Sequence, residues 1–311
     1  MNRPLLRASI WSTLTLGAAF GAFNLLVVHA RLAANPPSHN QSHAGFQIWG
    51  FVFLFVLASG DVRSRFALWG TLAAQALITW GRVDVLPGAL AALALGSLLQ
   101  LVVTVSVRAS FTWIVSAALL VAGAIEALIE GDVNASIRWA HAMYAVALFG
   151  AAFPWLHPLK AGRWLSRLGG VVMAVGAIAR STEAADVGLL LVAVSGALYG
   201  RPMGLLFAAV ASGYAMANLA VGASSLILDA ARHAFTLGVL TLAIFERAGA
   251  RSPWGVRLIV AGTLLRQAQV VAAFFPAWLY VSAFSGFIAA AGVVLAGAAT
   301  LRTPRSEPPP R

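Results

Sequence analysis

Long apolar runs follow one another along nearly the whole chain and are separated by short polar segments. Because a helix of about 20 residues crosses the hydrocarbon layer of a membrane, each run predicts a membrane-spanning helix. The runs predict about twelve such helices, over residues 9–30, 43–60, 66–81, 86–107, 111–130, 136–156, 165–180, 186–200, 203–222, 228–246, 255–274 and 277–300. The two-residue alternation of a membrane β-barrel is absent. We therefore expect an all-α polytopic membrane protein.

Composition excludes a soluble protein of this length. Over 311 residues the chain is 60% hydrophobic and only 10% charged, with a mean hydropathy of +0.85. A soluble domain carries far more charge on its surface. The first run, 9–30, is longer than the apolar core of a signal peptide, so we expect it to be retained as the first span.

The net charge of +11 indicates a membrane orientation rather than a nucleic-acid partner. With the N-terminus inside, the predicted spans place most basic residues in cytoplasmic segments. The outer segments then hold only Arg31, Arg82, Arg138, Arg180 and Arg232. We expect a multi-pass protein of the bacterial inner membrane with both termini cytoplasmic and the lipid bilayer as its partner. Residues 302–311 (RTPRSEPPPR) predict a disordered cytoplasmic tail.

One dipeptide recurs at nearly even intervals along the chain. It occurs as His43-Ala44, His141-Ala142 and His233-Ala234. Each copy begins an even-numbered predicted helix near its outer end, four helices after the previous copy. The spacing predicts three pseudo-repeated four-helix units within a bundle over residues 1–301, with boundaries near 1–108, 109–201 and 202–301.

Imidazole is costly in lipid unless it has a partner, so these histidines are candidate ligands for a metal or cofactor. His43 and His233 are the best pair, because two helices facing each other across a bundle can supply axial donors to one haem iron. Imidazole suits iron, copper and zinc alike. His141 is a further metal candidate, or a hydrogen-bond partner of Glu126 or Glu130. For each histidine taken singly, capping of a helix end or a bond to a carbonyl is the favoured interpretation.

Arg266 lies within a predicted span and needs an anion there. Glu126, Asp229 or the carboxylate of a ligand could supply it, so both an internal salt bridge and a haem propionate fit. The chain has no cysteine, which excludes disulfides, thiolate metal sites and covalent haem attachment. Any haem is therefore held non-covalently.

Two segments resemble a known family. Residues 43–65 read HAGFQIWGFVFLFVLASGDVRSR, similar to the helix-2 signature H-x-H-x-Q-x-x-G-F of NnrS-type haem–copper membrane proteins, which are distantly like haem–copper oxidase subunit I. Residues 232–247 read RHAFTLGVLTLAIFER and resemble their helix-10 segment, R-H-A-x-T-x-G-x-x. These segments cover a small part of the chain.

The resemblance implies three four-helix units and a single b-type haem between helices 2 and 10, with His43 and His233 as ligands and Arg266 as a propionate partner. It favours haem over copper and implies a role in the nitric-oxide or nitrosative-stress response, or in metal or haem handling. Three departures stand out: Gly45 replaces the second histidine of helix 2, helix 10 has one histidine rather than an H-x-H pair, and helix 7 has none. We therefore do not expect oxygen reductase activity.

A second class of function remains open. Repeats, glycine-rich helices and a buried arginine also suit a cofactor-free membrane transporter or assembly scaffold. No Walker loop, GxSxG elbow, HExxH or dinucleotide fingerprint appears in a usable context, so the sequence leaves any enzymatic activity uncertain.

Overall fold

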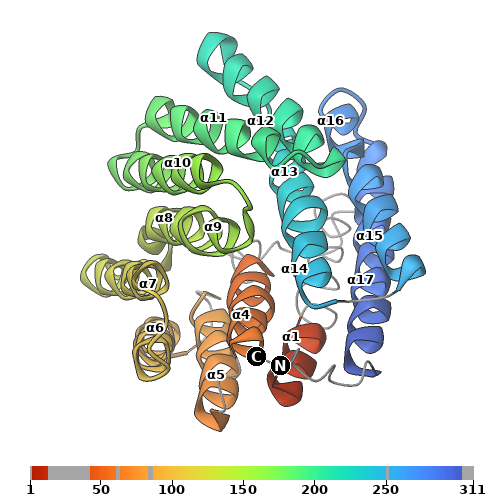
Figure 1. The fold of residues 1–311 in the computed structure, drawn as a ribbon. Helices are drawn as coiled ribbons and strands as arrows, with labels where there is room; N and C mark the ends of the chain where they lie inside the picture. The colour runs from red at the N-terminus through yellow and green to blue at the C-terminus, as the bar shows by residue number, and fades with distance from the viewer. Residues whose placement is uncertain (1, 13–42, 61–63, 83–86, 250–251, 303–311) are drawn as a thin grey trace.

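The computed structural model describes residues 2–12, 43–60, 64–82, 87–249 and 252–302, and these residues form helices and turns without any strand (Figure 1). The expected all-α class is confirmed for this part of the chain. Most of the predicted first span, the loop before residue 43 and residues 303–311 of the predicted tail lie outside the described residues. Arg302, which we expected in the tail, is instead the last residue of a helix.

The chain first forms α1 (Arg3–Ser12), a helix over 43–59 made of η2 (Phe46–Phe53) and α4 (Leu54–Ser59), then α5 (Arg65–Gly81), α6 (Ala89–Ser106) and α7 (Phe111–Glu130). A 3₁₀ turn, η3 (Val133–Ser136), leads into a helix made of α8 (Ile137–Ala145), η4 (Val146–Ala152) and α9 (Phe153–Leu156). The remaining elements are α10 (Lys160–Ala179), α11 (Thr182–Leu198), α12 (Pro202–Val221), α13 (Ser225–His233), η5 (Ala234–Thr241), α14 (Leu242–Arg247), α15 (Pro253–Arg266), α16 (Ala268–Ala272) and α17 (Trp278–Arg302).

Some helices begin earlier than the apolar windows predict, because polar residues form their first turn. α10 begins at Lys160 and α11 at Thr182, four or five residues before the predicted starts. At α11 the side chain of Ser181 accepts a hydrogen bond from the backbone of Ala184, which is a regular N-cap. Polar residues are favoured in such turns, so hydropathy alone places these starts too late.

Six helices among the described residues are long and apolar enough to cross a membrane. They are Ala89–Ser106, Phe111–Glu130, Val133–Leu156, Pro202–Val221, Ser225–Arg247 and Trp278–Arg302, and His43–Ser59 is a shorter apolar helix. Large apolar side chains are exposed on the outer faces, among them Trp69, Phe111, Ile129, Val221 and Phe284. Such continuous apolar surface is suited to lipid rather than water. The chain is a helical membrane protein.

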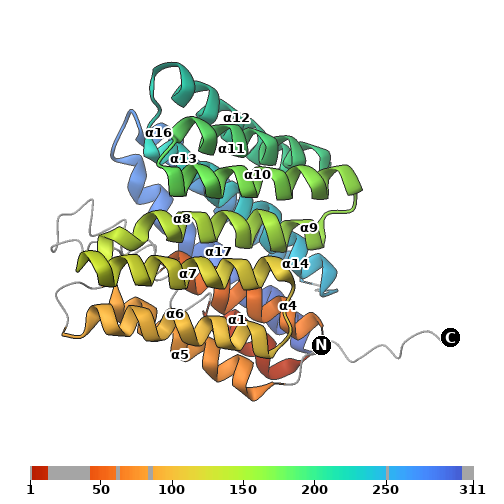
Figure 2. The ribbon, with the colours of Figure 1, turned by 90° about the vertical axis from the view of Figure 1, so that its left-hand side faces the viewer.

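Neighbouring helices in the sequence also lie side by side. α6 contacts α7, α7 contacts α8, and α8 contacts α10, and together they form one flank of the bundle (Figure 2). Short connections of this kind favour antiparallel neighbours.

Three helices contain π-helical segments, and each segment follows one of the His-Ala pairs. The segments are η2 after His43-Ala44, η4 after His141-Ala142 and η5 after His233. The part of the chain that the structure describes has no other π-helical element. Because π-helix is rare and concentrates at functional sites, its recurrence beside each copy of the dipeptide is a second feature shared by these three helices.

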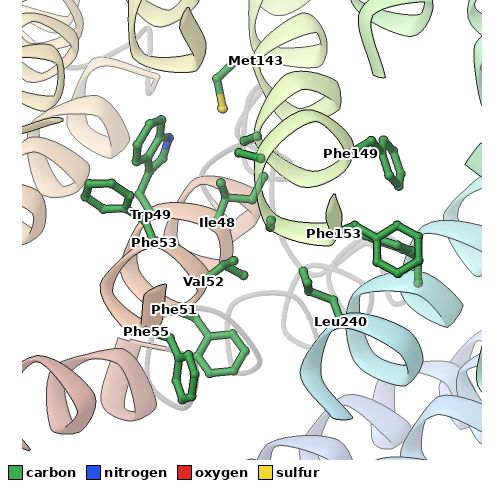
Figure 3. Packing of buried hydrophobic residues seen from close by; sticks show 14 of the residues in the cluster. Ile48, Trp49, Phe51, Val52, Phe53, Phe55, Met143, Phe149, Phe153 and Leu240 are labelled. Atoms are coloured by element: carbon green, nitrogen blue, oxygen red, sulfur yellow. The ribbon is translucent and has the colours of Figure 1, made fainter. Parts of the chain in front are cut away.

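These three helices occupy the interior of the bundle. In Val133–Leu156 and Ser225–Arg247, 72% and 56% of the apolar window is buried, against 33% to 50% in the other long helices. Phe51 packs on Phe245 with ring centres 6.2 Å apart, and Phe149 packs on Phe235 at 4.7 Å. Figure 3 shows this core, with Ile48 and Val52 facing the other two helices. The apolar core therefore fixes the positions of the three His-Ala helices relative to one another.

Glycine allows the last two long helices to pack backbone to backbone. A Cβ atom at Gly292 would lie 2.7 Å from the carbonyl oxygen of Gly255 and 2.7 Å from the amide nitrogen of Ile259. These are backbone atoms and have little freedom to move away. α15 and α17 can therefore approach closely only while position 292 has no side chain.

We predict that Gly292→Ala lowers the free energy of unfolding by about 1–3 kcal/mol, because the added methyl group overpacks this contact. Gly213→Ala is the matched control, since a Cβ at Gly213 in α12 meets nothing within 4 Å. The control should be neutral or stabilising by up to about 1 kcal/mol. Thermal unfolding of both variants in detergent tests this, and equal stability of the two would contradict it.

Candidate functional site

The structure brings His43 and His233 together. Their ring centres are 6.4 Å apart and their planes differ by 18°. His43 begins the helix over 43–59 and His233 ends α13, so the two imidazoles come from two of the three inner helices. Both residues are half-buried. The sequence-predicted pair is therefore close enough in space for one small group to contact both rings.

Each ring nitrogen of His233 has a polar neighbour. Nδ1 lies 2.8 Å from the backbone carbonyl oxygen of Asp229 and 3.3 Å from its carboxylate. Nε2 lies 3.2 Å from Nη2 of Arg266. Because a guanidinium can only donate, Nε2 is the acceptor, and the hydrogen atom of a neutral ring belongs on Nδ1. This tautomer directs the lone pair of Nε2 away from Asp229.

Arg266 is buried at the end of α15, with 6% of its side chain exposed. Its Nη1 donates to the carbonyl oxygen of Ser282 in α17 at 3.0 Å, and its Nη2 is 3.4 Å from the Asp229 carboxylate. Of the anions considered for Arg266, the structure pairs it with Asp229. Glu126 is occupied elsewhere, since its carboxylate accepts hydrogen bonds from Arg138 and Trp139.

The predicted helix over 255–274 is interrupted beside this pair. α15 ends at Arg266, Gln267 is in a turn, and the short helix α16 follows. The side-chain amide of Gln267 donates to the carbonyl oxygen of Ala230 at 3.3 Å, which ties the interruption to α13. Gln267 keeps α-region backbone angles, and Gln269 two residues further on also reaches Asp229, where its Nε2 donates to the carboxylate at 2.5 Å.

Asp229 is therefore the centre of the site. Its carboxylate or carbonyl oxygens contact His233, Arg266 and Gln269. Sequence reasoning considered Asp229 only as a partner of Arg266 and missed both its contact with His233 and the role of Gln269. The spacing of Asp229 and His233, four residues apart in one helix, is a signal that could have revealed the first contact.

His141 lies on α8 and is exposed. Its ring centre is 6.5 Å from that of Tyr144, whose hydroxyl group is 3.2 Å from Nη1 of the buried Arg82. Among the described residues, no three histidine, aspartate or glutamate side chains are grouped closely enough to hold a metal ion. The structure therefore gives His141 no set of metal-ligating neighbours.

Position 45, where the family pattern has a second histidine, is closely packed in the structure. A Cβ atom at Gly45 would lie 3.0 Å from Oε1 of Gln75 in α5. Gln75 is itself held in place, because its Nε2 donates to Oε1 of Gln100 in α6 at 3.0 Å. Any side chain at position 45 would require this buried amide to move. A second ligand from this turn is thus replaced by close contact with α5.

Comparisons with family models, with curated proteins and with solved structures find no match to this chain. The resemblance of residues 43–65 and 232–247 to NnrS-type proteins therefore remains an expectation. The site has to be judged on its own geometry.

The separation of the two rings, which are stacked while Nε2 of His233 lies 3.2 Å from Arg266, can be compared with that of two imidazoles bound to one metal. A metal ion lies about 2.0 Å from an imidazole nitrogen, so two rings on opposite sides of one metal have centres roughly 6 Å apart. The centres of His43 and His233 are 6.4 Å apart. The hydrogen bond from Nδ1 of His233 to a carbonyl oxygen is also the usual second contact of a metal-bound histidine.

We predict that Asp229→Asn destabilises the cofactor-free protein by about 3 kcal/mol or more, because it leaves the buried Arg266 uncompensated, and that Arg266→Gln costs less, because the side chain of Asp229 is 33% exposed. The double variant should be more stable than the sum of the two losses implies. Unfolding of all three variants in detergent tests this.

The control is Glu246→Gln, which removes the exposed pair between Glu246 and Arg201. This pair should contribute less than about 1 kcal/mol. If Asp229→Asn lowers the free energy of unfolding by no more than Glu246→Gln does, the Asp229–Arg266 pair has no special role in stability.

Proposed function

We propose that this chain is an integral membrane haem-binding protein, with one b-type haem held by His43 and His233. The observation that supports the proposal is the approach of two imidazoles from different helices to a ring-centre separation of 6.4 Å, close to the roughly 6 Å expected for two imidazoles bound to one metal. Nδ1 of His233 is bonded to Asp229, so Nε2 would be the donor atom once Arg266, which lies 3.2 Å from it, moves aside. Each ligand comes from a different helix, and the apolar core sets the distance between them.

Haem fits this pair better than a free metal ion does. A porphyrin supplies four ligands of its own, so the protein needs to add only two. The part of the chain that the structure describes supplies two imidazoles here, and the carboxylate beside them, that of Asp229, is already paired with Arg266 and Gln269. Arg266 is positioned beside His233 and would provide a cation for a propionate.

The chemistry of such a site would be electron transfer or sensing. When bound through both axial positions, a haem supplies a one-electron redox centre without an open site for oxygen. His43 and His233 would hold the iron, and Asp229 would fix the orientation of one imidazole. The resemblance to NnrS-type proteins supports a role in the nitric-oxide response or in haem handling.

The proposal includes about twelve spans in three four-helix units, in the bacterial inner membrane with both termini cytoplasmic. The recurrence of a π-helical segment after each His-Ala pair supports the repeat. The start of α1 packs on the end of α4, where the amide of Asn2 donates to the carbonyl oxygen of Ala58 at 2.9 Å. This contact supports placing the start of α1 at the cytoplasmic end of the second span.

We predict that the purified protein has a Soret band and a low-spin haem spectrum, and that His43→Ala or His233→Ala abolishes the low-spin spectrum by removing an axial ligand. His141→Ala is the matched control, since it alters the third His-Ala pair and should leave the spectrum unchanged. Absorbance spectra and iron analysis after haem reconstitution provide the measurement. Absence of any Soret band from the reconstituted wild type would refute the proposal.

We predict opposite sidedness for two exposed serines that can be labelled as cysteines. The chain has no cysteine, so Ser225→Cys and Ser110→Cys each give a single thiol without background. Under the proposed topology Ser225 faces the outside and Ser110 the cytoplasm. A membrane-impermeant maleimide should label only Ser225→Cys in intact spheroplasts, and both variants after lysis. Labelling of Ser110→Cys in intact spheroplasts would contradict this orientation.

One observation favours transport as a second candidate. The interruption between α15 and α16 beside the buried Arg266 is a feature of substrate sites in transporters, where broken helices expose backbone groups to a ligand. A haem-free protein whose solute transport is lost in Arg266→Gln but kept in His43→Ala would establish this alternative.

A further inference from the structure

The guanidinium of Arg266 covers the nitrogen of His233 that a metal would need. Its Nη2 is 3.2 Å from Nε2, closer than it is to the Asp229 carboxylate at 3.4 Å. A metal bound to Nε2 would stand about 2.0 Å from that nitrogen, within a few ångströms of a permanent positive charge. A free cation at this site therefore meets direct electrostatic repulsion in a partly desolvated environment.

Arg266 is not easily displaced from this position. It is buried, and its Nη1 is bonded to the carbonyl oxygen of Ser282. Asp229, its counter-ion, is in turn bonded by Gln269. These contacts come from α13, α16 and α17, so the guanidinium is held from several sides. Because its Nη2 lies 3.2 Å from His233 and 3.4 Å from Asp229, uncovering Nε2 would require only a small shift of Nη2 from the first partner toward the second.

The same guanidinium has one unused donor. Its Nε is buried and has no hydrogen-bond acceptor among the described residues. A buried donor without an acceptor costs free energy and is usually satisfied by a ligand or water. An anionic group arriving with a ligand would both accept this bond and draw the guanidinium away from Nε2.

From this geometry we infer that the positive charge of Arg266 keeps free metal cations off the His43–His233 pair. The pair then admits a metal only within a complex that carries its own anionic groups. The inference rests on the proposed function for the identity of that complex. It makes Arg266 a residue that determines specificity. Asp229 has the supporting role of counter-ion.

The test titrates Cu⁺, which two imidazoles can bind, into haem-free protein in detergent. A chromophoric copper chelator competes for the metal and reports how much of it the protein binds. Wild type should not bind Cu⁺ at this pair. Arg266→Gln should gain a site at least about 100-fold tighter, because the repelling charge is gone. Arg266→Lys retains a positive charge and should behave as wild type does.

Two controls tie the gain to the site. Adding His43→Ala or His233→Ala to Arg266→Gln should abolish copper binding, whereas adding His141→Ala should not. The double variant Asp229→Asn/Arg266→Gln avoids an uncompensated buried charge and should gain the same site, so poor folding of Arg266→Gln alone would not prevent the test.

The inference is overturned if wild type binds Cu⁺ as tightly as Arg266→Gln does, or if the gain survives loss of His43. A parallel haem titration of the same samples separates the two proposals. If the protein binds haem but Arg266→Gln gains no copper site, the role of Arg266 is refuted and the haem proposal stands. If Arg266→Gln gains a copper site that depends on both histidines but the wild type binds no haem, the exclusion of free cations by Arg266 is supported and the haem proposal is refuted.

Discussion

A guanidinium inside a helical membrane protein has to be paired with an anion, and at Arg266 that anion is Asp229. The pair does more than neutralise charge. It joins α13 to α15, it is extended by Gln269 of α16, and through the Ser282 carbonyl oxygen it reaches α17. Because His233 is bonded to the same aspartate, the orientation of its imidazole depends on this pair as well.

The apolar core and the polar site depend on the same three helices. Their inner faces are filled with aromatic and small side chains, so close packing sets the relative positions of the helices. The π-helical segments lie in this packed region, directly after the histidines or within two turns of them. A rigid apolar framework thus holds the polar groups at one end of the bundle, as precise placement of cofactor ligands requires.

Much of this arrangement could be predicted from the sequence, because length and hydropathy directly encode a membrane helix. The recurrence of the His-Ala pairs also singled out three histidines, two of which, His43 and His233, lie close together in the structure. The break at Gln267 was not predicted, because the hydropathy window over 255–274 runs through it and the contact of Gln267 with Ala230 of α13 is tertiary. The π-helical segments were equally invisible, because η2 is buried on nearly all sides and leaves no periodic pattern of polar residues to count.

The π-helical segments have a consequence for how such a scaffold can change. Each one accommodates an additional residue within a helix whose ends stay anchored in the bundle. Deleting a single residue from Phe46–Phe53 would restore α-helical geometry and rotate the preceding turn by about 100° around the helix axis. His43 would then point elsewhere while α4 kept its packing. Insertion or deletion of one residue can therefore redirect a ligand while the membrane domain keeps its packing. Such a change offers a short route between members of a fold that do and do not carry a cofactor.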